Sequence, residues 1–236
     1  MSIAENVAAI RAKMDAAAKA CGRDPKDIVL CAATKMNDSD AVRQAIAAGV
    51  GVCGENRVQE LTVKLSDNAY AGAQVHFIGH LQTNKVKQVV GKVDLIQSVD
   101  SMHLAAAIQK EAAKQGITQD ILLEVNIGAE ESKSGFAPDS LMDALEEIAK
   151  LPNLRVKGLM AIPPVCENPG DNDKFFQEMY QLTVDITTKK GDNVCVDILS
   201  MGMSGDYEQA IRYGSTMIRV GTAIFGPRNY NTTHQN

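Results

Sequence analysis

Residues 198–226, ILSMGMSGDYEQAIRYGSTMIRVGTAIFG, decide the fold. A short apolar strand pattern at 197–201 is followed by a turn rich in Gly and Ser and by a helical pattern at 207–213. Gly214 ends that helix, and a second apolar strand pattern follows at 216–220. Two buried strands joined through a helix are typical of parallel α/β folds, so this stretch predicts one such unit.

The two turns of this stretch carry groups suited to holding an anion. Ser204 offers a hydroxyl in the first turn. Gly221 and Thr222 open the second turn, where a residue without Cβ lets backbone N–H groups approach a phosphate closely. Arg219 is the only fixed charge within the apolar run MIRVGTAIF. Because a buried cation needs a partner, we expect Arg219 either to contact a ligand or to pair with a nearby carboxylate.

Upstream of this stretch, strand and helix patterns alternate from the first residues. Ser2 and Glu5 match a capping box, so the chain is predicted to begin with a helix, which Gly22 ends. Short apolar strands are predicted at 28–34, 50–53, 74–78, 94–99, 121–127 and 154–162. Helical patterns lie between the strands at 39–48, 57–65, 83–90, 102–116, 138–150 and 174–190.

Eight strands alternating with helical patterns predict a single (β/α)8 TIM barrel over 1–228, with a polar tail at 229–236. The alternative is a doubly wound open sheet, but the chain has no GxGxxG after its first strand and no GxxxxGK[ST]. A TIM barrel carries its chemistry at the carboxyl ends of the strands, and phosphates often bind after strands seven and eight. We expect the loop at 165–173 to be a flexible cover over that end.

Composition restricts the class of partner. The 236-residue chain is 45% hydrophobic with a net charge of −5, which provides a full core but no basic surface for nucleic acid or anionic membranes. No run approaches the ~20 apolar residues of a membrane span, and no signal peptide is predicted. Five scattered cysteines without a CxxC pair argue against disulfides and structural zinc, and favour a reduced, cytoplasmic location. We also expect a monomer.

Three more polar residues follow predicted strands and would face the same mouth of the barrel. Lys35 follows a wholly apolar strand, where desolvation favours the neutral amine, a nucleophile toward an aldehyde; the alternative is an ordinary surface lysine. Asn56 either contacts a ligand or caps the next helix, and His80 either contacts a ring or is structural. His76 and His80 are not expected to share a metal, because four residues of extended chain span about 13 Å.

Six motifs, in order along nearly the whole chain, resemble the pyridoxal phosphate homeostasis proteins. They are CAATK at 31–35, GENRVQE at 54–60, HFIGHLQTNK at 76–85, EESKSG at 130–135, GLMAIPP at 158–164 and LSMGMSGDYEQAIRYGSTMIRVGTAIFG at 199–226. The sequence departs from the usual pattern at Cys53, where an aromatic residue normally precedes GEN, and at Val75, where Trp normally precedes HFIG. The resemblance implies an alanine racemase N-terminal domain-like barrel that carries pyridoxal 5′-phosphate (PLP) on a lysine.

The resemblance also implies a role for each candidate residue. Lys35 would form a Schiff base with the aldehyde of the cofactor. Ser204 and the backbone at Gly221 and Thr222 would hold its phosphate, and Arg219 would face its pyridine nitrogen. The rest of the pocket would be lined by Asn56, His80 and Met201.

The expected chemistry favours a binding protein over an enzyme. A guanidinium keeps its proton, so Arg219 would donate a hydrogen bond to the pyridine nitrogen and leave the ring a weak electron sink. Racemases of the alanine type work with such an arginine, but they take a second base from an additional domain, for which we expect no room here. We therefore expect storage of PLP and its delivery to apoenzymes, without substantial catalysis. The alternatives are a small PLP-dependent racemase-like enzyme and a phosphate-ester enzyme without an aldehyde cofactor.

Overall fold

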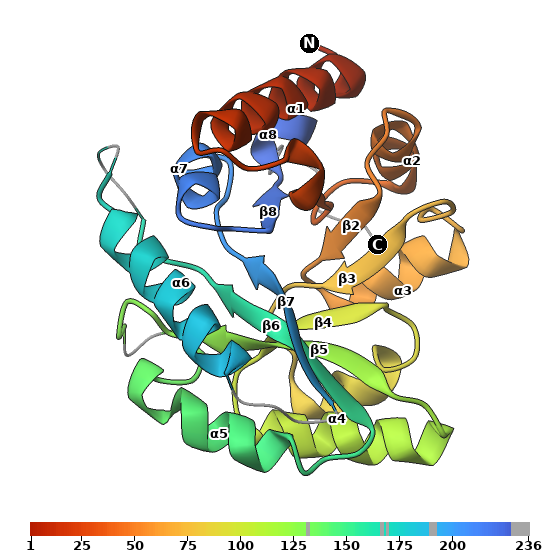
Figure 1. Cartoon of the computed structure of the whole chain (residues 1–236). Helices are drawn as coiled ribbons and strands as arrows, with labels where there is room; N and C mark the ends of the chain where they lie inside the picture. Colours follow the sequence, from red (N-terminus) through yellow and green to blue (C-terminus); the bar gives the residue numbers. More distant parts are fainter. Residues whose placement is uncertain (131–132, 166–167, 169, 189–192, 228–236) are drawn as a thin grey trace.

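Eight parallel strands close into the predicted barrel (Figure 1). The computed structural model describes residues 1–130, 133–165, 168, 170–188 and 193–227. In chain order the strands are β1 (Val29–Ala33), β2 (Val52–Glu55), β3 (Gln74–Phe77), β4 (Leu95–Val99), β5 (Gln119–Val125), β6 (Leu154–Ala161), β7 (Val194–Ser200) and β8 (Met217–Val220). Each strand pairs with the next, and β8 pairs with β1, so neither end of the sheet is left open.

Helices alternate with the strands and lie outside them (Figure 1). The α-helices are α1 (Ile3–Ala20), α2 (Ser39–Ala47), α3 (Val58–Ser66), α4 (Met102–Gln115), α5 (Leu141–Ile148), α6 (Asp173–Thr187), α7 (Tyr207–Arg212) and α8 (Thr222–Phe225). Three short 3-10 helices are η1 (Pro25–Asp27), η2 (Thr83–Gln88) and η3 (Pro138–Ser140). Ser101 caps α4 and the left-handed Gly116 ends it, as the sequence predicts.

Two predicted features fall partly or wholly outside the described residues. The polar tail at 229–236 is one of them, so the domain boundary at 228 stays a prediction. The other is the cover at 165–173, of which residues 166, 167 and 169 are not described. The proposed mobility of that loop therefore also stays a prediction.

Apolar side chains on both faces of the strands explain why the strand patterns are almost continuously hydrophobic. Residues such as Phe77, Ile121 and Leu123 belong to one large cluster in which the strands pack against the helices. Alternate strand residues fill the barrel itself in two smaller clusters. One contains Cys31, Ala33, Val52, Ile78 and Met217, and the other contains Leu95, Leu122 and Met160.

Helix α1, near the start of the sequence, packs against the last described elements of the chain. The predicted capping box is present, since Ser2 and Glu5 each accept a backbone hydrogen bond from the other through their side chains. α1 packs against α7 and α8 (Figure 1), and the Asn6 side chain donates a hydrogen bond to the Ile224 carbonyl at 2.8 Å. This contact supports the segment that follows β8.

Two glycines allow close approaches that no other residue would permit. A Cβ on Gly79 would lie 2.2 Å from the carbonyl oxygen of Asn56, so the chain after β3 packs directly on the chain after β2. Gly158 has a φ of +143°, and a Cβ there would lie 1.8 Å from the Ile198 carbonyl oxygen. The register of β6 shifts beside Gly158 with both of its neighbours.

Some elements differ from the prediction. The segment expected to be a helix over 83–90 is the short 3-10 helix η2 (Thr83–Gln88), which no side chain caps. β5 ends at Val125 rather than at 127, because the N–H of Asn126 turns to the Phe136 carbonyl. β2 covers Val52–Glu55 rather than 50–53, which places Glu55 in the wall of the barrel.

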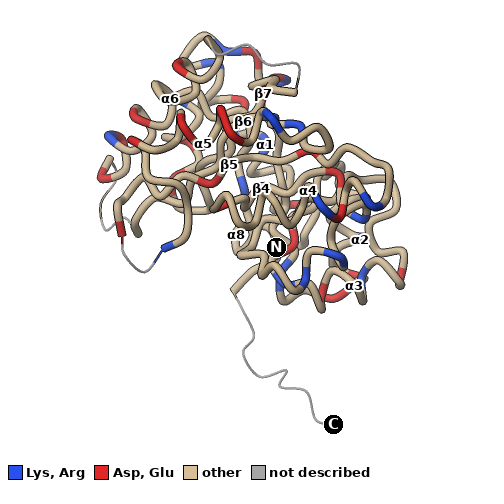
Figure 2. Tube along the Cα trace, turned by 90° about the horizontal axis from the view of Figure 1, so that it is seen from below, with Lys and Arg blue, Asp and Glu red and all other residues tan. Residues whose placement is uncertain are grey.

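Figure 2 shows Lys and Arg residues interspersed with Asp and Glu residues along the trace, rather than gathered on one element. In the described part of the chain, no helix is long and apolar enough to cross a membrane.

Candidate functional site

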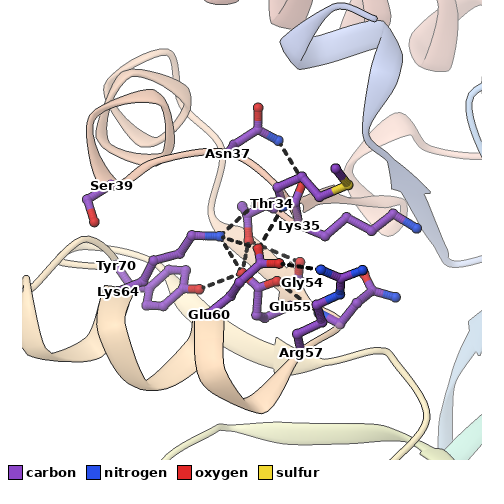
Figure 3. Close-up of polar contacts among 12 residues, drawn as sticks. Thr34, Lys35, Asn37, Ser39, Gly54, Glu55, Arg57, Glu60, Lys64 and Tyr70 are labelled. Carbon is purple, nitrogen blue, oxygen red and sulfur yellow. Dashed lines mark hydrogen bonds and ion pairs between the residues drawn. The ribbon is translucent and has the colours of Figure 1, made fainter. Parts of the chain in front are cut away.

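Lys35 lies on a tight turn directly after β1. Asn37 closes this turn twice, through its N–H to the Thr34 carbonyl at 3.2 Å and through its side-chain amide to the Lys35 carbonyl at 3.0 Å. Met36 has a φ of +61°, which is uncommon outside glycine, and its N–H donates to Glu60 Oε2 at 2.7 Å. The backbone of the turn is therefore held on both sides of the lysine, whose side chain extends away from the supporting residues (Figure 3).

A buried ion pair supports this turn from behind (Figure 3). Lys64 and Glu55 are 4% and 0% exposed, and Lys64 Nζ lies 2.6 Å from Glu55 Oε2. The same ammonium group donates to the Thr34 carbonyl at 2.8 Å and lies 3.4 Å from Glu60 Oε2. The hydroxyls of Thr34 and Tyr70 also donate to Glu55 Oε2. Each buried charge thus has the partners that burial requires.

The surroundings of Glu55 keep the neighbouring acids protonated. Burial, followed by the Glu55 charge, raises the pKa of Tyr70 well above its ordinary value. Burial raises the pKa of Cys53 to about 12, with Glu55 again the second cause. Both groups therefore stay neutral at physiological pH.

The turns after β7 and β8 bring two hydroxyls together at the mouth of the barrel. Thr222 Oγ1 lies 3.2 Å from Ser204 Oγ. Asp206 shapes the turn of Ser204, because its Oδ1 accepts a backbone N–H within the turn at 2.7 Å. Gly221 follows β8, and a Cβ there would come within 3.3 Å of the Ala33 carbonyl oxygen, so the backbone packs closely at this point. The predicted anion-binding groups therefore gather in one place.

One cavity joins the Lys35 turn to the turn after β8. It has a volume of about 240 Å³ and is lined by Lys35, Met36 and Asn37 on one side and by Gly221 and Thr222 on the other. The two sides meet because β1 and β8 are neighbours in the closed barrel. The structure thus brings together an amine and a candidate phosphate turn that are almost the whole chain apart.

A larger cavity, of about 300 Å³, lies at the opposite end of the barrel. Four aspartates line it, and its lysine, Lys157, is paired with Asp197 at 2.6 Å. Asp27 and Asp94 at this cavity are exposed. An acidic, solvated rim repels a phosphate, so we place the candidate site at the smaller cavity beside Lys35.

Arg219 lies inside the barrel and is only 4% exposed. Its Nη1 donates to Ser200 Oγ at 2.6 Å, and its Nη2 donates to the Ala161 carbonyl at 2.8 Å. No ion pair joins Arg219 to a carboxylate among the described residues, so the expected carboxylate partner is absent there. Burial lowers the pKa of the guanidinium. Only two of its five N–H groups are used in these bonds, which leaves donors for a ligand.

Like Ser204 and Arg219, the remaining candidate residues are not among those that line the cavity beside Lys35. The side chain of His80 is 61% exposed and lies 3.1 Å from Asp100 Oδ2. Met201 is completely buried in the large core cluster. Asn56 does not cap α3, because Arg57 is the N-cap residue and no side chain caps this helix. Asn56 Oδ1 is buried without a hydrogen-bond partner among the described residues.

Sequence reasoning missed four residues that face or support the site. Glu55 and Lys64 support the Lys35 turn, and Gln97 bonds inside the barrel to Ser200. Burial raises the pKa of Glu124, at the carboxyl end of β5, to about 7. For Gln97 and Glu124 the available signal was a polar residue within an apolar strand, as in LIQSV and ILLEV.

Comparison with known proteins assigns the family. The family model described as alanine racemase, N-terminal domain, matches residues 2–229. A protein of Aquifex aeolicus (strain VF5) named pyridoxal phosphate homeostasis protein is 42% identical over 230 residues, which cover 98% of this chain and 100% of that protein. The chain belongs to the pyridoxal phosphate homeostasis protein family.

Solved structures show that this pyridoxal phosphate homeostasis family member shares its whole barrel with known proteins. PipY of Synechococcus elongatus PCC7942, solved with PLP bound, has a TM-score of 0.82 at 30% identity, covering 95% of this chain and 100% of that chain. An alanine racemase from Corynebacterium glutamicum has a TM-score of 0.67 at 13% identity, covering 97% of this chain and 63% of that chain. The second likeness concerns the fold alone.

Proposed function

We propose that this protein holds PLP reversibly on Lys35 and so takes part in the homeostasis of the cofactor inside the cell. The name of the Aquifex relative and the PLP bound to PipY support this function. Within the chain itself, the cavity that has Lys35 on one side and Gly221 with Thr222 on the other carries the proposal. An amine and an anion-binding turn in one cavity match the aldehyde and the phosphate of PLP.

The residues of the cavity fit the chemical groups of PLP. Lys35 would hold the cofactor through its amine, which is the group suited to bond an aldehyde covalently. Ser204 and Thr222, with hydroxyls 3.2 Å apart, offer donors to the phosphate. At Gly221 a side chain would crowd Ala33, so the backbone itself can face the anion. When bound, the cofactor supplies the aldehyde and an electron-withdrawing ring.

Arg219 supports a binding role rather than a catalytic one. A guanidinium can only donate, so opposite the pyridine nitrogen it leaves that nitrogen unprotonated and the ring a weaker electron sink. We therefore propose that the protein has no substantial catalytic activity. Exchange of the α-proton of amino acids with solvent deuterium measures this directly. Exchange at a catalytic rate with any amino acid would favour the racemase-like alternative.

Because the proposed bond between Lys35 and PLP is reversible, the protein could release PLP to other proteins. We propose that the protein works as a monomer in the cytoplasm and passes PLP to PLP-dependent apoenzymes, with no nucleic acid or membrane as a partner. Sedimentation measures the oligomeric state. For delivery, the measurement is the rate at which an apoenzyme regains activity with the loaded protein, compared with an equal concentration of free PLP. Equal rates would argue against delivery.

The test of the function is an absorption spectrum of the purified protein incubated with PLP, followed by borohydride reduction and peptide mass mapping. We expect a yellow protein whose reduced pyridoxyl group maps to Lys35. Lys35→Ala should lose this adduct, whereas Lys110→Ala, which changes an exposed lysine on α4, should keep it. A wild-type protein that stays colourless would reject the proposal and favour a phosphate-ester enzyme.

A further inference from the structure

A chain of hydrogen bonds crosses the inside of the barrel from Arg219 to His76. Arg219 Nη1 donates to Ser200 Oγ at 2.6 Å, and Ser200 Oγ bonds Gln97 Oε1 at 2.7 Å. Gln97 Nε2 lies 2.9 Å from His76 Nδ1. The four side chains are between 0% and 4% exposed. We call these four residues the barrel relay.

Every hydrogen bond of the barrel relay has a fixed direction. Arg219 can only donate, so the Ser200 oxygen accepts from it and the Ser200 hydroxyl hydrogen goes to Gln97 Oε1. The amide NH₂ of Gln97 then donates to His76 Nδ1. Burial lowers the pKa of His76 to about 4, so the ring is neutral and can accept at this nitrogen. A reversed Gln97 would place its Oε1 against Met217 Sδ, which cannot donate a hydrogen bond; in the observed orientation Gln97 Nε2 lies 3.1 Å from that sulfur.

Packing alone does not explain a polar relay in this position. The interiors of such barrels are mainly filled by branched apolar side chains, and Leu95, Leu122 and Met160 do so here. Burying an amide and an imidazole gains nothing over apolar residues of the same size, even when both are hydrogen-bonded. The relay does, however, end on the guanidinium of Arg219, whose orientation matters at the mouth of the barrel.

We propose that Gln97, acting through Ser200, is a positioning residue that sets the direction of the Arg219 guanidinium toward the ring nitrogen of PLP. This inference rests on the proposed function. Ser200 Oγ and the Ala161 carbonyl take one N–H from each terminal nitrogen of Arg219, which fixes the plane of the group. The hydrogen bond from the Ser200 hydroxyl to Gln97 Oε1 holds the Ser200 side chain in the rotamer that places its oxygen against Arg219. Gln97 itself does not touch the cofactor.

The relay therefore determines, before PLP binds, which N–H groups of Arg219 remain available to the ligand. Hydrogen bonds to a charged donor strengthen along a chain, because each polarises the next. Without the Gln97 acceptor, the Ser200 side chain can change its χ1 rotamer, and the guanidinium then loses one of its two fixed partners. PLP binding would then have to order the arginine, which weakens affinity.

The experiment compares Gln97→Met, which removes the amide but keeps the length of the side chain, with Leu122→Met, a change inside the same barrel that leaves the relay intact. The full-length proteins are titrated with PLP and followed by absorption, and folding is checked by near-UV circular dichroism. We expect Gln97→Met to raise the PLP concentration at half saturation about tenfold. The pH midpoint of the visible band should also move, whereas Leu122→Met should change neither quantity.

A second variant protects the test against misfolding. Gln97→Leu combined with His76→Leu removes both polar groups of the far half of the relay, so the imidazole is not left without its partner and, within the relay, only the Ser200 hydroxyl loses its acceptor. It should weaken PLP binding as Gln97→Met does. Wild-type half saturation and an unchanged band in either folded variant would overturn the positioning role while leaving the proposed function intact. A wild-type protein that binds no PLP would instead overturn both.

Discussion

Lys64 Nζ and Glu55 Oε2 lie 2.6 Å apart with both side chains buried, and this pair forms the back of the turn that carries Lys35. The ammonium group also holds the Thr34 carbonyl, so the ion pair is bonded directly to the backbone before Lys35. The charge of Lys64 and the position of Lys35 are therefore linked.

Lys64→Met should destabilise the protein strongly, because it leaves the Glu55 carboxylate buried without its cation. We expect the free energy of unfolding to fall by about 3–5 kcal/mol, measured by urea denaturation. The control is Lys150→Met, since Lys150 and Glu147 are 67% and 59% exposed and such a pair contributes less than about 1 kcal/mol. Similar losses in the two variants would show that the buried pair has no special role.

The close approach at Gly79 predicts a contrast between two Gly→Ala variants. Gly79→Ala should destabilise by at least about 1–3 kcal/mol, because its Cβ would meet the Asn56 carbonyl at 2.2 Å and the backbone must shift. In Gly51→Ala the new Cβ meets no atom within 4 Å, and we expect a change within about 0.5 kcal/mol. Thermal denaturation measures both. Equal thermal midpoints for the two variants would mean that the close contact between the segments after β2 and β3 contributes little to stability.

The titration of Glu124 predicts a pH-dependent gain in the variant Glu124→Gln. Burial raises the pKa of Glu124 to about 7, above the value of about 4.3 for an unfolded chain. Between these values the folded protein holds a proton that the unfolded chain releases, so Glu124 costs stability as the pH rises, by at most about 1.4 kcal/mol per pH unit. Relative to wild type, Glu124→Gln without PLP should therefore gain stability from about pH 4.5 to about pH 7. A difference that stays constant with pH would contradict this.

His76 titrates in the opposite sense and masks this effect in the wild-type protein. Burial lowers its pKa to about 4, so the stability it contributes is lost as the pH falls from about 6.5 toward 4. The contributions of Glu124 and His76 largely cancel where the two windows overlap. We therefore expect stability to fall more steeply with decreasing pH for Glu124→Gln than for wild type between about pH 6.5 and pH 4.5, both measured by urea denaturation.

The cysteines should divide into two reactivity classes. Burial raises the pKa values of Cys31 and Cys53 to about 12, so neither forms the thiolate that an alkylating reagent needs. Cys21 and Cys195 are exposed. A hydrogen bond with Asp197 raises the pKa of Cys195, so Cys21 should react first. Mass mapping after brief iodoacetamide treatment checks the order, and early labelling of Cys31 would mean that β1 opens readily.

Much of the fold was predictable because local signals decide it. Apolar strands of four to eight residues alternate with helices that begin at caps such as Ser101 and end at residues such as Gly116. This alternation is typical of a parallel barrel. The turn residues Ser204, Gly221 and Thr222 were also accessible to sequence reasoning, because the fold type fixes which loops face one another. The structure places Ser204 beside Thr222 and lines one cavity with Thr222 and Lys35, as this argument requires.

The interior of the barrel was not predictable in the same way. Gln97 and Ser200 meet from β4 and β7, and Glu55 meets Lys64 only because β2 is two residues later than its apolar pattern indicates. Such contacts depend on register and on closure, and a slip of one residue would turn each side chain to the other face. For Met201, the family resemblance implied a pocket role, but its side chain lies in the large core cluster.

The pairing of β1 with β8 has a consequence for the newly made chain. During synthesis Lys35 leaves the ribosome early, while Gly221 and Thr222 follow only when nearly all the described residues have been translated. Until then the lysine has no partner strand on that side and no phosphate turn. The proposed capture of PLP can therefore begin only after Gly221 and Thr222 have been translated, and the ligand then bridges two segments that lie far apart in the sequence.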